Sequence, residues 1–162
     1  MCHLKLLYNS YLKSHLDYGS ALFTTANKTT IKPILILQKK AIRLICGAGY
    51  REHTAPLFLD QKLLTFDKIM TFNSCKFMFD YKKNLLPPYF HDKWRFNRDV
   101  HNYAVRNADD FYIENVSRPS LKKHPLFQFP VLWNSLPPVL KSIESRKVFT
   151  KELYTYLLNL ID

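Results

Sequence analysis

Cysteine and glycine are both scarce in this sequence. Its 162 residues include three cysteines and three glycines. Cys2, Cys46 and Cys75 lie far apart and form no C-x-x-C pair, which excludes a zinc knuckle and a dithiol redox motif. A sparse, odd cysteine count is typical of a reducing compartment. We therefore expect an intracellular protein, nuclear or cytoplasmic and not secreted, without a cysteine-based metal site.

Long apolar runs are absent as well. The longest aliphatic stretch, 34–37, is far shorter than the roughly 20 residues of a membrane-spanning helix. His3 and Lys5 interrupt the N-terminal region in which a signal peptide needs an unbroken apolar core. We expect no signal peptide and no membrane partner.

Acidic side chains are few compared with basic ones. The chain has 24 Lys or Arg against 13 Asp or Glu, a net charge of +11, which favours an anionic partner such as nucleic acid. Residues 1–50 contain seven of the basic side chains and a single acid, Asp17. Aromatic residues make up 15% of the chain, too many for a disordered basic tail. The composition predicts one folded domain, or a piece of a larger chain.

Apolar residues recur at helical spacing in four segments, 4–16, 29–46, 65–83 and 145–161. Gly19 and Gly47 follow the first two segments as helix stops, and Thr65 and Ser145 can cap the other two. The third segment is apolar on two sides, which is typical of a central helix. The positions expected in the core are Leu4, Leu7, Tyr8, Tyr11, Leu12 and Leu16 in the first segment, and Ile31, Ile34, Leu35, Ala41, Ile42 and Ile45 in the second.

Regular spacing disappears from Leu86 to Phe129, and we expect a small irregular or hairpin-containing portion between about Asp92 and Phe129. Prolines and scattered aromatic residues in this region indicate turns, short helices and a β-hairpin near residues 118–120. The expected fold class is therefore mainly α: a helical bundle with a small irregular or β-hairpin-containing portion.

One face of the second helical segment is cationic. At 100° per residue, Lys28, Lys32, Lys39 and Arg43 project within a stripe of about 60°, and Lys40 flanks them. Such a row can contact successive phosphates. An ordinary solvated helix face, the other interpretation, would carry acids at i±4 for mutual support, and no acid lies between Lys28 and Arg43. We therefore expect these five residues to bind nucleic acid.

Catalytic and metal-binding groups are weakly indicated. Asp109 and Asp110 form a carboxylate pair of the kind that can bind catalytic metal ions, but Arg106 and Asn107 precede them where hydrophobic residues are needed. The six histidines have neither metal-ligand spacing nor a nucleophile elbow beside them. We expect no catalytic residue, no metal ligand and no cofactor, and keep a metal-dependent nucleotidyl transferase using Asp109 and Asp110 as an alternative.

Several strings, taken in order, resemble a known family. They are YNSYL at 8–12, LDYG at 16–19, LQKKAIRLI at 37–45, REHTAPLF at 51–58, HNYAVR at 101–106 and WNSLP at 133–137. Together they are similar to the region that follows the polymerase palm in jockey-like non-LTR retrotransposon reverse transcriptases. The string at 37–45 is the most diagnostic. Phe23, Val105 and Phe129 stand where the family usually has Trp, Thr and Gly.

The resemblance implies a role for each part of the chain. Residues 1–56 correspond to a thumb-like helical segment, and 57–162 to a C-terminal helical segment packed on it. The thumb of such a polymerase grips the template and primer, so the implied partners are an RNA or RNA/DNA duplex backbone and the missing palm and fingers domains. Lys39, Lys40 and Arg43 match the family string, whereas Lys28 and Lys32 join them only through the helical projection. The fragment itself is expected to be non-catalytic, although the parent is an RNA-directed DNA polymerase.

Other functions stay open. Residues from about Leu57 onward could form a packing platform or an RNA-binding appendage. A host-retained helical interaction module without nucleic-acid binding would use the apolar stripe of 145–161 against a protein partner. Membrane-surface binding by the second helix is a further alternative, which the lack of Trp and Phe on that helix disfavours.

Overall fold

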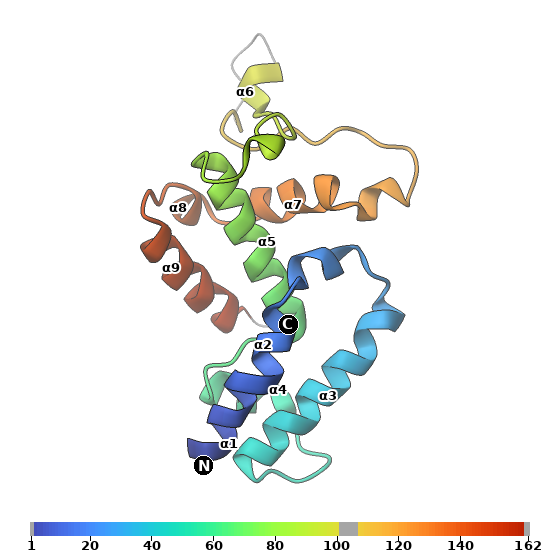
Figure 1. The fold of residues 1–162 in the computed structure, drawn as a ribbon, viewed down its shortest axis with the longest axis vertical. Helices are drawn as coiled ribbons and strands as arrows, with labels where there is room; N and C mark the ends of the chain where they lie inside the picture. Colours follow the sequence, from blue (N-terminus) through green and yellow to red (C-terminus); the bar gives the residue numbers. More distant parts are fainter. Residues whose placement is uncertain (1, 101–106, 161–162) are drawn as a thin grey trace. The chain divides into compact units, whose positions relative to one another are not determined.

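The computed structural model describes residues 2–100 and 107–160, and most of them are helical. Nine α-helices, α1 to α9, lie in this described part, together with short π and 3₁₀ segments (Figure 1). The same residues contain no β-strand, and their one isolated β-bridge is antiparallel, between Phe96 and Phe111. The mainly α fold expected from the sequence is confirmed.

The chain forms two compact units. The first consists of residues up to Phe72 together with those from Tyr154, and the second runs from Asn73 to Leu153. The boundaries fall inside α5 (Phe66–Lys82) and α9 (Arg146–Asn159). The sequence-based division near residue 56 falls instead inside α4 (Thr54–Asp60), which belongs to the first unit.

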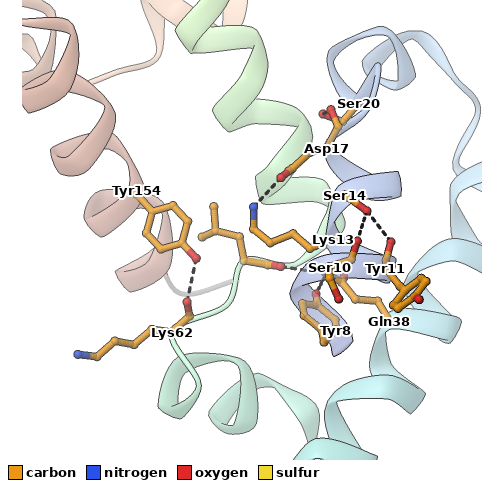
Figure 2. A network of polar contacts seen from close by, with 11 residues as sticks. Tyr8, Ser10, Tyr11, Lys13, Ser14, Asp17, Ser20, Gln38, Lys62 and Tyr154 are labelled. Atoms are coloured by element: carbon orange, nitrogen blue, oxygen red, sulfur yellow. Dashed lines mark hydrogen bonds and ion pairs between the residues drawn. The ribbon is translucent and has the colours of Figure 1, made fainter. Parts of the chain in front are cut away.

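The first unit begins with one continuous helix of mixed type. It consists of α1 (Cys2–Leu7), a π-helical segment (Tyr8–Lys13) and α2 (Ser14–Asp17), followed by Gly19 at φ 63°. The Ser14 hydroxyl donates to the carbonyl of Ser10 at 2.6 Å, a bond that bends helices (Figure 2). The helix and its stop agree with the predicted segment.

The buried face of this helix differs from the predicted one. Tyr8 and Leu16 are buried, whereas Leu4, Leu7 and Tyr11 are 47%, 52% and 69% exposed. Tyr8, the partly buried Leu12 and Leu16 are spaced by four, which suits a π turn because it takes more residues than an α turn, and Tyr11, three positions after Tyr8, is rotated outward. Leu4 and Leu7 precede the π-helical segment, in α1, and are exposed as well. The prediction that Leu4, Leu7 and Tyr11 lie in the core was wrong.

The longest helix of the first unit is α3 (Lys28–Cys46), which packs against α1 and α4 (Figure 1). Gly47 ends it at φ 65°, the left-handed cap expected there. The helix continues through Pro33, which lacks the N–H that would bond one turn back. Ile31, Ile42 and Ile45 are buried as predicted, and Ile34, Leu35 and Ala41 are partly buried.

Gln38 is a buried polar residue of α3 that the apolar pattern did not predict. Its side chain is 1% exposed and bonds three groups. Nε2 donates to the Tyr8 hydroxyl at 2.9 Å (Figure 2). Nε2 also donates to the Leu64 carbonyl at 2.9 Å, and Oε1 accepts the backbone N–H of Phe66 at 2.8 Å. Burial raises the pKa of Tyr8, against a lowering by the bond from Gln38, so the hydroxyl stays neutral at physiological pH.

The bond from Gln38 changes how α5 begins. Phe66 is the first residue of α5, so its N–H is one of the donors that a helix start leaves unpaired. The hydroxyl of Thr65, predicted to cap this helix, is buried without a hydrogen-bond partner among the described residues. Gln38, from a distant part of the sequence, satisfies the first amide instead.

The core of the first unit surrounds these contacts. It is built from one buried residue of the N-terminal helix, two of α3, one of α4 and one of the following loop. These are Tyr8, Ile42, Ile45, Phe58 and Leu63, with Leu12, Ala41, Cys46 and Leu57 packed against them. Because α4 supplies Phe58, the chain between the predicted helical segments 29–46 and 65–83 is partly helical and contributes to the core.

The second unit has an aromatic core. On α5, Phe77 contacts Phe90, Trp94 and Phe129, and Phe79 stacks on Phe149 of α9 at 4.5 Å between ring centroids. Aromatic partners on both sides of α5 agree with its predicted central position within this unit. The fully buried Trp133 contacts Phe111 and Phe149. Burial raises the pKa of the nearby Cys75 thiol on α5 to about 12, which keeps it neutral and unreactive.

All but one of the shorter elements of the second unit, the exception being α6, begin at or just after a proline. The shorter elements are a 3₁₀ turn (Pro88–Phe90), α6 (Asn97–Val100), a second 3₁₀ turn (Leu121–Lys123), α7 (Pro125–Asn134) and α8 (Pro138–Lys141). The described residues of the region near 92–129 before α7, 92–100 and 107–124, form turns and short helices, as expected. The predicted hairpin at 118–120 is wrong: these residues form a turn in which the Leu121 N–H donates to the Arg118 carbonyl at 3.1 Å.

Candidate nucleic-acid interface

The predicted cationic residues lie on α3, and four of the five are exposed. Lys28, Lys32, Lys39 and Lys40 are exposed, and no carboxylate of the described residues lies within ion-pair distance of them. Lys28 and Lys39 are separated by about 16 Å along the helix at 1.5 Å per residue. Lys28, Lys32 and Lys39, called here the lysine row, therefore present unpaired charge over the length of several phosphates.

The lysine row flanks the buried side of α3. Projected at 100° per residue, its mean direction lies about 90° from that of the buried residues Ile31, Gln38, Ile42 and Ile45. Lys40 projects about 170° from the buried side and so stands apart from the row. Because the lysine row lies beside the core, a rigid partner can contact the row without contacting the opposite side of α3.

Arg43 is placed differently from the lysines. Its side chain is partly buried, and Nε donates to the carbonyl of Glu52 at 3.0 Å. The Glu52 carboxylate in turn accepts the backbone N–H of Gly49 at 3.1 Å. Arg43 therefore supports the loop that follows α3, in addition to carrying its positive charge beside the lysine row.

Apolar side chains are also exposed on α3. Ile36, Leu37 and Leu44 are 45%, 55% and 72% exposed. A contiguous group of such residues can mark an interaction surface. By contrast, the stripe of 145–161 that the protein-interaction alternative would use is largely buried. Phe149 and Leu153, which belong to the second unit, are 0% exposed, and Leu157, which belongs to the first, is 3% exposed. That particular docking stripe was wrongly predicted.

The two candidate catalytic carboxylates are paired with different cations. Asp109 bonds Arg98 of α6 at 2.7 Å, and the partly buried Asp110 bonds Lys141 of α8 at 2.8 Å. A shared metal ion would have to displace both partners. No group of three His, Cys, Asp or Glu side chains in the described part of the chain is placed to hold a metal ion. The geometry gives this pair a structural use, linking a loop to α6 and α8.

The segment that carries Asp110 is held in place by Asn134 of the WNSLP string. The N–H of the buried Phe111 donates to Asn134 Oδ1 at 3.0 Å, and Asn134 Nδ2 donates to the Phe111 carbonyl at 2.8 Å. The Asn134 amide thus pairs with this backbone as a neighbouring strand would. Lys141 adds a bond to the Asn134 carbonyl at 2.7 Å.

Asn134→Ala is expected to lower the free energy of unfolding by about 2–3 kcal/mol, because both backbone groups of a buried residue lose their partners. Asn115→Ala, a change at an exposed loop position, is the matched control and should stay within about 0.5 kcal/mol. Urea denaturation followed by circular dichroism measures both. Equal values for the two variants would contradict the role given to Asn134.

Gln38 lies inside the most diagnostic string, 37–45, but the apolar pattern did not predict its role. A polar residue at a core position of an otherwise apolar helix face was the available signal.

The string at 101–106, with its Val105, lies outside the described residues. Along the described chain, no helix is both long enough and apolar enough to cross a membrane. Searches against protein-family models, curated proteins and solved structures find no match for this chain.

Proposed function

We propose that this chain binds the backbone of an RNA or RNA/DNA duplex through α3. In this proposal it is the non-catalytic thumb and C-terminal region of an RNA-directed DNA polymerase that resembles those of jockey-like non-LTR retrotransposons. The palm and fingers domains of that polymerase are its further partners. The observation that supports the proposal is the lysine row: three exposed cations on one helix face without a described acidic partner.

Within the 37–45 string, one residue stabilises the fold and its neighbours are exposed to a ligand. Gln38 points inward and bonds Tyr8, Leu64 and Phe66, whereas Lys39 and Lys40, which follow it directly, are exposed. The buried bonds fix the rotation of α3 about its axis. Fixing that rotation holds the lysine row on one side, which is what a sequence-tolerant phosphate-binding surface needs.

Replacing the lysine row by glutamine should reduce the salt dependence of binding. Each phosphate contact contributes roughly −0.9 to the slope of log K against log salt, so Lys28→Gln, Lys32→Gln and Lys39→Gln together should make the slope about 2.7 less negative. Between 50 and 200 mM KCl, the row then accounts for about a 40-fold loss of affinity. Fluorescence anisotropy with a labelled RNA/DNA hybrid measures the slope.

A triple variant elsewhere on the chain controls for net charge. Lys62→Gln, Lys147→Gln and Lys151→Gln remove the same charge from exposed positions outside α3. This control should retain most of the slope of the unaltered chain. If both triple variants have the same slope of log K against log salt, exposed lysines contribute equally wherever they lie on the chain. In that case α3 is not the binding face.

The exposed apolar residues of α3 favour a second candidate function, a protein interaction surface. Leu37→Ser with Leu44→Ser would then reduce self-association or partner binding at salt concentrations that release RNA. The lysine-row variant would leave that interaction unchanged. Light scattering and gel filtration at high and low salt distinguish this function from duplex binding.

A further inference from the structure

The second unit contains an open pocket of about 540 Å³. It lies where the segment around Trp94, the irregular residues 112–116 and the beginning of α7 come together. This volume is within the range of about 300–1,000 Å³ that is usual for small-molecule sites. The pocket is built entirely from residues of the second unit and shares none with α3.

Aromatic and apolar side chains line the inside of the pocket. Trp94 is buried, and its indole N–H donates to the carbonyl of Leu126 at 2.7 Å, which fixes the orientation of the ring. Tyr112 and Phe127 are partly buried lining residues, and Pro130 is a buried one. Rigid aromatic walls of this kind suit a flat, weakly polar ligand, because they offer stacking surfaces at low entropic cost.

Positively and negatively charged side chains also line the pocket, and they are exposed. Lys93 and Arg95 carry positive charge, and neither forms an ion pair with a described carboxylate. The Lys93 ammonium lies 4.2 Å from the centre of the Tyr89 ring, a contact that orients it and leaves its charge uncompensated. Asp92 and Glu114 add hydrogen-bond acceptors to the same lining.

His124 adds a donor to the lining. Its Nδ1 accepts the backbone N–H of Leu126 at 3.3 Å, at the first turn of α7. A neutral imidazole that accepts through Nδ1 carries its proton on Nε2, so that atom can donate to a ligand. The pocket therefore combines flat apolar walls, cationic and neutral donors, and carboxylate acceptors.

We propose that this pocket binds one nucleotide with an unpaired base. The base stacks against the aromatic walls, its amino and imino groups face Asp92 or Glu114, and its phosphate faces Lys93 and Arg95. A nucleotide satisfies all three sets of groups, whereas an acyl chain would leave the polar ones unused. A base within a duplex is stacked and paired, so the ligand is either a free nucleotide or a nucleotide of a single strand.

Calorimetric titration with AMP, GMP, adenosine, inorganic phosphate and a five-nucleotide RNA tests the proposal. Lys93→Gln with Arg95→Gln is the test variant, because both side chains are exposed and their loss should leave the fold intact. We expect this variant to weaken binding of the nucleotides about tenfold or more and to leave the weaker binding of adenosine nearly unchanged. The matched control is Arg118→Gln with Lys147→Gln, two exposed cations that do not line the pocket.

The probes separate the two sources of the nucleotide. Tighter binding of the five-nucleotide RNA than of AMP and GMP indicates a single strand, and the reverse order indicates a free nucleotide. The proposal is overturned if none of the nucleotide probes binds, if test and control variants bind alike, or if inorganic phosphate binds as tightly as AMP. The lysine-row variant of α3 should bind AMP and GMP normally, so failure of this pocket and failure of duplex binding by α3 give different results.

Discussion

Gln38→Met is expected to lower the free energy of unfolding by about 3–5 kcal/mol, although the new side chain has nearly the same length. The exchange removes the partners of the Leu64 carbonyl and the Phe66 N–H, and frees the Tyr8 hydroxyl. A buried donor or acceptor that loses its partner costs about 1–3 kcal/mol. Because Gln38 is 1% exposed, water cannot replace these bonds without opening the core.

Two further substitutions isolate the cause. Leu37→Met changes the neighbouring position of the same helix, which is 55% exposed, and should stay within about 0.5 kcal/mol. Tyr8→Phe removes one of the three bonds and should cost about 1–2 kcal/mol. Urea denaturation measured by circular dichroism orders the three variants. If Gln38→Met is no more destabilising than Leu37→Met, the amide does not hold α3, α5 and the N-terminal helix together.

Trp133→Ala should lower the free energy of unfolding by about 3–5 kcal/mol, the usual cost of truncating a fully buried aromatic side chain. The indole is 0% exposed and packs against Phe111 and Phe149. The cavity left by alanine would remove packing from the centre of the second unit. Guanidinium denaturation with the far-ultraviolet signal as the probe measures the loss.

Trp133→Phe is expected to cost much less, about 1–2 kcal/mol. The Nε1 group of Trp133 is buried without a hydrogen-bond partner in the described structure. Replacement by phenylalanine therefore removes an unsatisfied polar group together with part of the ring. Val139→Ala, at a site 76% exposed on α8, is the control and should be nearly neutral. A Trp133→Phe variant as unstable as Trp133→Ala would show that Nε1 makes a bond that stabilises the fold.

Local patterns in the sequence predicted the long helices well. Apolar spacing and Gly47 located α3, and the same spacing located α5 and α9, because periodicity and caps act within one segment. The exposure of the lysine row follows from the same spacing, since a cation row on an amphipathic helix turns away from the buried stripe. Its use in binding nucleic acid stays a proposal.

Features that depend on distant residues could not be predicted. The Gln38 bonds join residues that are 26 to 30 positions apart, and Asn134 pairs with Phe111 across 23 positions. The π-helical segment turns Tyr11 outward through a change of helical register that an α-helical projection does not contain. The pocket of the second unit joins three separated segments, so no local pattern marks it.

The placement of Gln38 beside Lys39 and Lys40 bears on how this region can diverge over time. The inward amide is constrained by folding whatever the chain binds, whereas the two outward ammonium groups are constrained only by a ligand. Under the proposed function, a descendant that no longer bound nucleic acid but kept the fold would preserve position 38 and let positions 39 and 40 drift toward neutral or acidic residues. Joint retention of all three would instead signal continued selection for an anionic partner.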